Sequence, residues 1–280
     1  MIEILIPITI IVATKNEEKN IADCLSRLKK FNEIIVVDSN SDDATVAIAN
    51  DFGATIYDFL WNGDMPKKRQ WILENVPIRN DWIFFLDADE RMREPLINEL
   101  NDFILRGDLV EFSAGQVVLQ TIYCGKALKF GFKTKGIKLL RYKECSFDAI
   151  DDSLAPGLGE MEGHFQPSYQ GRLYKLHNML DHDDVDELSK WFTRHINYAR
   201  WDAWVNSSVQ TKKIINSKKA GRAKFFHNLP GRPITFFFYS YFWKLGFLDG
   251  LSGLRYALSY SWYYWLCFLI KQDSKRTNRF

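Results

Sequence analysis

The sequence has few of the features that mark secreted, zinc-binding or membrane-spanning proteins. It contains four cysteines in 280 residues, Cys24, Cys124, Cys145 and Cys267, and no Cys-x-x-Cys pair. This scatter argues against a disulfide framework and a zinc ribbon, and it suits a reducing compartment. No apolar run reaches the roughly 20 residues that a membrane-spanning helix requires. We therefore expect a cytoplasmic protein.

The sequence also lacks a strong net charge. Its 37 basic and 35 acidic residues leave a net charge of +2, so the bulk charge does not indicate a nucleic-acid partner. The distribution is uneven, because no acidic residue occurs between Asp202 and Asp249. The basic residues of that stretch are Lys212, Lys213, Lys218, Lys219, Arg222, Lys224, Arg232 and Lys244.

The first 105 residues alternate between strand-like and helix-like patterns. Strands are expected at residues 8–13, 34–37, 55–59 and 82–86, with helices starting near residues 21, 41, 68 and 95. The first apolar run, Ile4–Ala13, lacks a basic region and a cleavage site, so it predicts a buried strand rather than a signal peptide. The strands are continuous apolar runs, typical of a parallel sheet covered on both faces. The sequence predicts an α/β, doubly wound fold.

The pattern changes beyond residue 105. Ala114–Tyr142 is strand-rich, residues 143–180 are loop-like, and Leu188–Val205 is helical. Two later segments, Ile234–Trp243 and Leu254–Ile270, are dense in Phe, Tyr, Trp and Leu. Amphipathic aromatics beside basic residues are typical of helices lying in a membrane interface, where anionic lipid adds on the order of 1 kcal/mol per cation. The alternative is a pair of aromatic core helices.

Polar residues follow three of the predicted strands. These segments are Thr14–Glu18, Asp38–Asp42 and Asp87–Glu90. The carboxyl ends of strands in an open sheet face the ligand crevice. Aspartates at i and i+2, such as Asp87 and Asp89, can share a divalent cation, because Mg²⁺ and Mn²⁺ prefer oxygen ligands. Each segment alone is explained by a helix cap or polar loop, but their joint occurrence indicates a ligand site.

The three segments resemble the successive nucleotide-sugar motifs of family 2 glycosyltransferases, which have the GT-A fold. The motifs are Ala-Thr-Lys-Asn-Glu-Glu, Val-Val-Asp-Ser-Asn-Ser-Asp-Asp and Leu-Asp-Ala-Asp-Glu. The resemblance covers about residues 8–205 and is strongest for the bacterial lipopolysaccharide-core β-1,4-glucosyltransferases and related exopolysaccharide enzymes, which Lys244–Gly250 also resembles. That subgroup's Gln-Lys-Asn element is not kept, because Lys67-Lys68-Arg69-Gln70 stands there.

The resemblance implies a role for each matching residue. The nucleotide-sugar would be bound by Thr14, Asn16, Glu17, Asp38, Lys68, Asp87, Ala88 and Asp89. Asp89 would hold Mg²⁺ or Mn²⁺ on the donor pyrophosphate, with Asp87 and His182 as further metal ligands. For His182, a polar cluster at a helix N-terminus is the alternative. Arg141 and Arg194 are expected to contact the acceptor or a phosphate.

Inverting transfer also needs a base to deprotonate the acceptor hydroxyl. In the subgroup a Val-His-Glu-like motif carries this base, followed by a Gly-x-Leu turn and then a histidine. Counting back from Gly171-Arg172-Leu173 places Glu162 at the base position, with Glu160 as the alternative. Met161 stands where the histidine is expected.

We therefore expect a metal-assisted inverting transfer from a UDP-sugar to a lipid-linked or lipopolysaccharide-type acceptor, at the inner face of the cytoplasmic membrane. Residues 1–205 would form the GT-A catalytic domain, with the donor half at 1–105 and the acceptor half at 106–205. Residues 206–280 would form peripheral membrane-associating helices. The alternatives are a haloacid-dehalogenase-like phosphatase, which also places Asp-x-Asp after a strand, and a catalytically silent GT-A scaffold.

Overall fold

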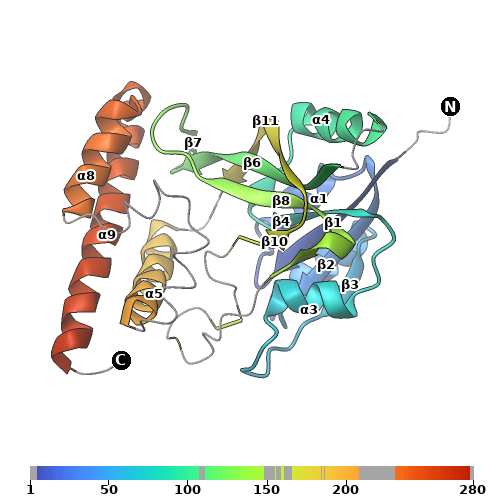
Figure 1. Ribbon diagram of the computed structural model, residues 1–280, viewed down its shortest axis with the longest axis horizontal. Helices are drawn as coiled ribbons and strands as arrows, with labels where there is room; N and C mark the ends of the chain where they lie inside the picture. Colours follow the sequence, from blue (N-terminus) through green and yellow to red (C-terminus); the bar gives the residue numbers. More distant parts are fainter. Residues whose placement is uncertain are drawn as a thin grey trace.

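A computed structural model describes residues 5–106, 111–147, 155, 159–160, 166–183, 185, 187–207 and 231–277. Within these ranges the chain forms a nine-stranded mixed sheet with helices around it (Figure 1). Its strands are β1 (Ile6–Thr14), β2 (Phe31–Asp38), β3 (Thr55–Asp58), β4 (Trp82–Asp87), β5 (Glu90–Arg91), β6 (Phe112–Tyr123), β7 (Lys126–Ala127), β8 (Lys135–Arg141) and β11 (Arg172–Asp183). A separate pair is formed by β9 (Cys145–Ser146) and β10 (Ser168–Tyr169).

The sheet order is β3-β2-β1-β4-β8-β6-β11-β5, with β7 paired to β6. The strands β3, β2, β1 and β4 are parallel, and β6 and β11 are parallel to each other. β8 runs antiparallel between β4 and β6, and β5 runs antiparallel to β11. The mostly parallel sheet confirms the predicted α/β class.

The helices follow the predicted alternation in the first half and continue to the C-terminal end. They are α1 (Ile21–Ser26), α2 (Thr45–Asp51), α3 (Lys68–Asn75), α4 (Glu94–Leu105), α5 (Leu188–Ser207), α8 (Arg232–Phe238) and α9 (Leu251–Thr277), with a π-helical turn η3 (Tyr239–Trp243) and 3-10 turns η2 (Tyr142–Glu144) and η4 (Gly246–Asp249). Pro95 stands in the first turn of α4, where its missing N–H costs nothing.

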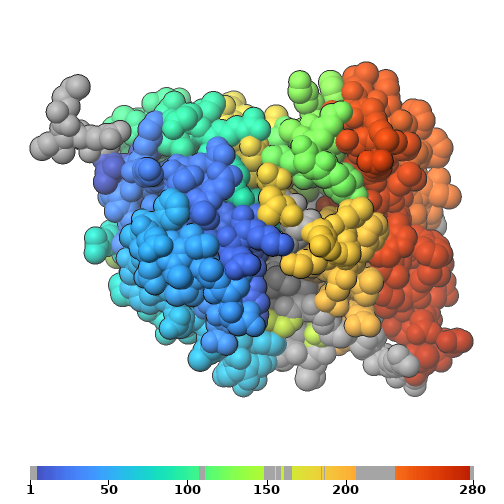
Figure 2. Space-filling model, turned by 180° about the vertical axis from the view of Figure 1, so that it is seen from behind, coloured from blue at the N-terminus to red at the C-terminus, as the bar shows by residue number. Residues whose placement is uncertain are grey.

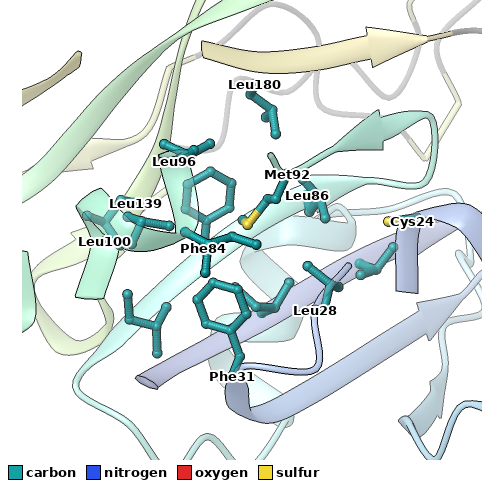
Figure 3. Close-up of a cluster of buried hydrophobic side chains, with 14 of the residues drawn as sticks. Cys24, Leu28, Phe31, Phe84, Leu86, Met92, Leu96, Leu100, Leu139 and Leu180 are labelled. Carbon is teal, nitrogen blue, oxygen red and sulfur yellow. The ribbon is translucent and has the colours of Figure 1, made fainter. Parts of the chain in front are cut away.

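Apolar clusters cover both faces of the sheet, which explains why the central strands are continuous apolar runs in the sequence rather than alternating apolar and polar residues. Side chains on one face of the sheet, such as Phe84 and Leu86, belong to one cluster with Leu96 and Leu100 of α4 (Figure 3). The neighbouring residues on the same strands, including Phe85, point into a second cluster on the other face. The buried stretches of the central strands are therefore unbroken apolar runs rather than alternating ones.

Phe84→Ala should lower the free energy of unfolding by about 3–5 kcal/mol, because the ring is fully buried and its loss leaves a cavity. Urea denaturation followed by circular dichroism measures the change. The control is Phe52→Ala, since that ring is 39% exposed and should cost well under 1 kcal/mol. Equal losses for the two variants would contradict the assignment of Phe84 to the core.

The expectation of a loop over residues 143–180 is wrong for its second part, which contains the long strand β11. A register shift between Lys175 and Met179 interrupts the strand's alternation. The Glu99 carboxylate of α4 accepts hydrogen bonds from the backbone N–H groups of His177 (2.8 Å) and Asn178 (2.9 Å) at this irregularity. Because the polar residues here are held by a distant helix, no local pattern marks the strand.

The aromatic C-terminal helices pack on one side of the molecule, with α5 between α9 and the sheet (Figure 1). Trp191 of α5 lies edge-on to Tyr260 of α9, with ring centroids 5.6 Å apart. The buried carboxylate of Asp249 accepts hydrogen bonds from the N–H groups of Lys129 (3.1 Å) and Phe130 (2.8 Å). The segment is thus joined to the loop between β7 and β8. No helix in the described part of the chain combines the length and apolar character needed for a membrane span.

Candidate functional site

The carboxyl ends of β1, β2 and β4 bring three predicted residues to one edge of the sheet. Thr14 pairs with Asp38 in the β1–β2 ladder, and Ala13 pairs with Asp87 in the β1–β4 ladder. The Thr14 hydroxyl donates a hydrogen bond to Asp38 Oδ1 at 2.9 Å. Parallel strands that end together create the ligand crevice of an open sheet.

The loops after β1 and β2 are bound to each other. Asn16 has a positive φ of 57°, and its Oδ1 accepts a hydrogen bond from the N–H of Asp42 at 3.0 Å. The helix expected to start near residue 41 begins at Thr45, with Ala44 at its N-cap, so Ser41 does not cap it. The Ser41 hydroxyl instead accepts a bond from the Asn16 N–H at 2.8 Å, while its own N–H donates to Asp38 at 2.7 Å. These bonds hold both loops at the crevice.

Glu17 is held by its neighbours on the same edge. Its N–H donates to Thr45 Oγ1 at 2.7 Å, and its carboxylate accepts a bond from the Asn20 amide at 2.8 Å. Glu17 therefore links the loop after β1 to the start of α2.

Lys68 connects the first strand end to the predicted base loop. Its buried ammonium donates to the Thr14 carbonyl at 2.9 Å and lies 3.8 Å from Glu160 Oε1. Glu160 therefore lies beside residues that are predicted to bind the nucleotide-sugar. Glu162 falls outside the described residues, as does Met161 before it.

Asp87 is held by two cations of the protein. Arg69 Nη2 lies 3.2 Å from Asp87 Oδ1, and Lys138 Nζ lies 2.8 Å from Oδ2. Desolvation opposes ionisation of this carboxyl, but Lys138 and then Arg69 lower its pKa well below the usual range. Asp87 is therefore an anion.

Glu90 is buried beneath the Asp87–Asp89 turn and is hydrogen-bonded to its backbone. Its Oε2 accepts bonds from Lys138 Nζ at 2.9 Å and from the Asp87 N–H at 3.0 Å. Burial is the main cause that raises the pKa of Glu90 to about 7, against the attraction of Lys138. Ala88 is also buried, and its carbonyl accepts a bond from Arg91 at 2.7 Å. Hydrogen bonds from Glu90 and Arg91 thus hold the backbone of the turn in place.

The pairing of β5 with β11 brings His182 to the carboxylates. His182 pairs with Glu90, and the Asp183 N–H donates to the Asp89 carbonyl at 2.8 Å. His182 Nε2 lies 3.3 Å from Asp89 Oδ2. Burial lowers the pKa of His182, but Asp89 outweighs it, with Glu90 and Asp87 adding to the effect, and raises the pKa to about 9. His182 is therefore at the site rather than in a helix cap.

The described residues supply two of the ligands that a divalent cation would need, Asp89 and His182. Among the described residues, no three His, Cys, Asp or Glu side chains converge as metal ligands. Asp89 and His182 face each other, whereas both Asp87 oxygens contact cations. Mg²⁺ is usually held by one or two carboxylates together with substrate phosphates, and His is a ready ligand for Mn²⁺. Asp89 fits that pattern, and His182 would join it by giving up its ring proton to the solvent when the cation binds.

The two predicted arginines lie in different places. Arg141 pairs with Trp82 at the start of β4, the end of the strand away from Asp87, and its guanidinium lies 3.2 Å from Glu144. The structure does not bring Arg141 to the carboxylates.

Arg194 lies on α5, whose side chains share a face of the molecule with the N-terminal half (Figure 2). Tyr198 lies one turn after Arg194. Its pKa is raised chiefly by burial and also by the charges of Asp89 and Asp87, whereas the charge of Arg194 lowers it. This part of α5 is therefore within electrostatic range of the two aspartates.

Sequence reasoning gave no role to three charged residues of this site, Arg69, Lys138 and Glu90, although Glu90 belongs to the predicted strand-end segment. One signal was available for Lys138, a lone charge between the apolar residues Ile137 and Leu139 of a strand. A buried charge in such a position requires a partner. Nothing local identifies which partner it has.

Comparison with known proteins finds sequence relatives and structural neighbours of this chain. Residues 9–143 match the model of the family described as glycosyl transferase family 2. An uncharacterized glycosyltransferase of Rickettsia typhi is 27% identical over 249 residues, covering 88% of this chain and 80% of the relative. The lipopolysaccharide core biosynthesis glycosyltransferase LpsC of Rhizobium meliloti is 23% identical over 273 residues, covering 90% and 89%. Glucosyl-3-phosphoglycerate synthase of Mycobacterium tuberculosis aligns over 42% of this chain and 44% of its own, with 22% identity and a TM-score of 0.28.

Proposed function

Since residues 9–143 match the family model of glycosyl transferase family 2, we propose that this chain transfers a sugar with inversion from a UDP-sugar to a lipid-linked or lipopolysaccharide-type acceptor. The observation that carries the proposal is the convergence of Thr14, Asp38 and Asp87 at one sheet edge, beside the Asp89–His182 pair. Carboxylates at that edge accept hydrogen bonds from ribose hydroxyls, while the adjoining pair lies where a pyrophosphate would follow.

The proposed donor site has a nucleoside end and a phosphate end. Thr14, Asn16, Glu17, Asp38 and Lys68 would hold the nucleoside, since hydrogen bonds join their loops into one rigid edge. Asp87, at the end of the neighbouring strand β4, would accept from the ribose.

Asp89 and His182 are the proposed ligands of Mg²⁺ or Mn²⁺, and Ala88 sets the spacing of Asp89 from Asp87. A bound divalent cation offsets the negative charge that develops on a nucleoside diphosphate leaving group. Asp89 also orients His182 through their 3.3 Å contact.

The proposed base is Glu162, with Glu160 as the alternative. A base must reach the acceptor hydroxyl within hydrogen-bond distance. The position of Glu160, 3.8 Å from Lys68, is consistent with a loop that approaches the donor edge. Arg194, on the helix associated with the carboxylates, is proposed to contact the acceptor.

The proposed acceptor class rests on two observations. The similarity to LpsC extends over 90% of this chain. The second is a set of exposed apolar side chains on α8, η3 and α9, namely Ile234, Phe238, Phe242, Trp243, Leu251, Leu258 and Trp265. Exposed apolar surface beside a stretch of sequence without acidic residues is typical of peripheral binding to anionic lipid. We therefore place the reaction at the cytoplasmic face of the membrane, on an enzyme of which residues 206–280 form the membrane-associating part.

Replacing Trp243 and Leu258 together by Ser should lower binding to anionic liposomes at least about tenfold, because each side chain contributes on the order of 2 kcal/mol when buried in the bilayer interface. Trp243 is 80% exposed and Leu258 51%, so the fold should tolerate both changes. Cosedimentation with phosphatidylglycerol-containing liposomes measures the effect, and Phe52→Ser with Leu60→Ser, two exposed positions in the other half of the chain, is the matched control. Unchanged sedimentation of the first pair would contradict the membrane assignment.

The proposed reaction is tested with a panel of UDP- and GDP-sugars, read by thermal shift in the presence of Mn²⁺ or Mg²⁺ and then by UDP release. Donor binding to the folded state should raise the melting temperature. Stabilisation by UDP-sugars and donor-dependent UDP release with a saccharide acceptor are expected. Phosphate release from a small phosphoester without UDP release would favour a phosphatase, and neither binding nor release would indicate a silent scaffold.

A further inference from the structure

Lys138 enters the site through an irregularity of the sheet. Gly115 of β6 lies opposite Leu139 of β8, and the next residue, Gln116, lies opposite Ile137. Lys138 is thus an extra residue on β8 that has no opposite number on β6. Bulges of this kind redirect one side chain and occur often beside active sites.

The neighbouring glycine makes this bulge possible. A Cβ atom on Gly115 would lie only 2.9 Å from Leu139 Cβ, so a larger residue there would push the two strands apart. The close approach of β6 and β8 and the extra residue therefore belong to one local arrangement.

The ammonium of Lys138 lies between two carboxylates, the partly exposed Asp87 and the buried Glu90. It lies 2.8 Å from Asp87 Oδ2 and 2.9 Å from Glu90 Oε2, and the Lys138 side chain is 8% exposed. Glu90 in turn accepts the Asp87 N–H at 3.0 Å. Lys138 and Glu90 thus bind Asp87 at both its side chain and its backbone.

We propose that Lys138 is a positioning residue of the donor site, which holds Asp87 for the nucleotide and keeps it out of the metal's coordination shell. This inference rests on the proposed function. With Arg69 on one oxygen and Lys138 on the other, Asp87 is compensated by protein cations, and Asp89 with His182 is left to the metal. The two aspartates of the motif then have separate tasks.

Lys138→Met should raise the KM for the UDP-sugar about 10- to 100-fold, the usual effect of removing a partner that orients a ligand-binding group. Mn²⁺ binding without nucleotide, measured by electron paramagnetic resonance, should become tighter, because the site gains one uncompensated negative charge and Asp87 is released toward the metal. A purely structural role would weaken both. Lys135→Met, an exposed lysine on the same strand, is the matched control, and Lys138→Arg should restore most of the donor affinity.

The double variant Lys138→Met/Glu90→Gln replaces both members of the buried Lys138–Glu90 pair by neutral side chains. It serves as the test protein if Lys138→Met alone does not fold. It should keep the wild-type melting temperature and still show the raised KM. In an Asp87→Asn background, Lys138→Met/Glu90→Gln should add no further loss, because its effect passes through Asp87.

A wild-type KM in the folded double variant, or a full additional loss in the Asp87→Asn background, would overturn the inference alone. A wild-type protein that binds no UDP would overturn the proposed function, and the inference with it.

Discussion

Asp89→Asn should reduce sugar transfer by about 10³-fold or more and abolish its dependence on divalent cations. The substitution keeps the side chain's volume but removes the anionic ligand, which leaves His182 without the carboxylate 3.3 Å away. A metal that stabilises a diphosphate leaving group supplies several kcal/mol, and each 1.4 kcal/mol corresponds to a factor of ten in rate. UDP release measured over a Mn²⁺ titration, with and without a chelator, checks both parts of the expectation.

The matched control is Asp102→Asn, an exposed aspartate on α4 outside the site. It should leave rate and metal dependence unchanged. The metal assignment would be lost if the Asp89→Asn enzyme kept its activity and the wild-type enzyme resisted the chelator.

Glu162→Gln should lower kcat by about 10²- to 10⁴-fold, the range expected for loss of a general base, while the affinity for the UDP-sugar stays near the wild-type value. The amide has nearly the same size but cannot accept the acceptor's proton. Turnover should be measured at saturating donor, and donor binding separately by equilibrium dialysis.

Glu160→Gln is the comparison that separates the two candidates. Because Glu160 lies 3.8 Å from Lys68, its loss should alter donor affinity modestly and leave most of kcat intact. If Glu160→Gln instead shows the large kcat loss with unchanged donor binding, Glu160 is the base and the position inferred for Glu162 is wrong.

Metal binding and proton transfer are proposed for different parts of the site, Asp89 and Glu162. The Asp87–Asp89 motif lies where a rigid strand ends and is supported from below by Glu90. Strand ends of this kind suit a binding task, because the backbone fixes where their side chains stand. Proton transfer is proposed for Glu162 or Glu160 instead, since the base has to meet an acceptor that arrives from outside the donor site.

Local pattern was enough to predict the first half of the fold and its strand-end motifs. The strands β1, β2 and β4 contain the unbroken apolar runs Ile10–Ala13, Ile34–Val37 and Trp82–Leu86, because both faces of the sheet are covered there, so their sequence shows the parallel sheet directly. Where such strands end, neighbouring residues share one edge by geometry alone. Thr14, Asp38 and Asp87 therefore came together as expected.

The remaining features depend on contacts between distant segments. β11 is punctuated by polar residues that Glu99 of α4 binds, so no periodic pattern revealed it. The burial of one side of the C-terminal aromatic helices against α5 was equally undetermined, because an aromatic stripe serves a core and a membrane equally well.

The sequence by itself determined the α/β class and the carboxylates at the ends of β2 and β4, since both follow from the order of apolar and polar residues along single strands. Only the tertiary structure decided which groups surround those carboxylates. His182 reaches Asp89 because β5 pairs with β11, and Lys138 reaches Asp87 because a bulge redirects it. Strand pairing and bulges join residues far apart in the chain, and their energies depend on packing that no local stretch of sequence contains.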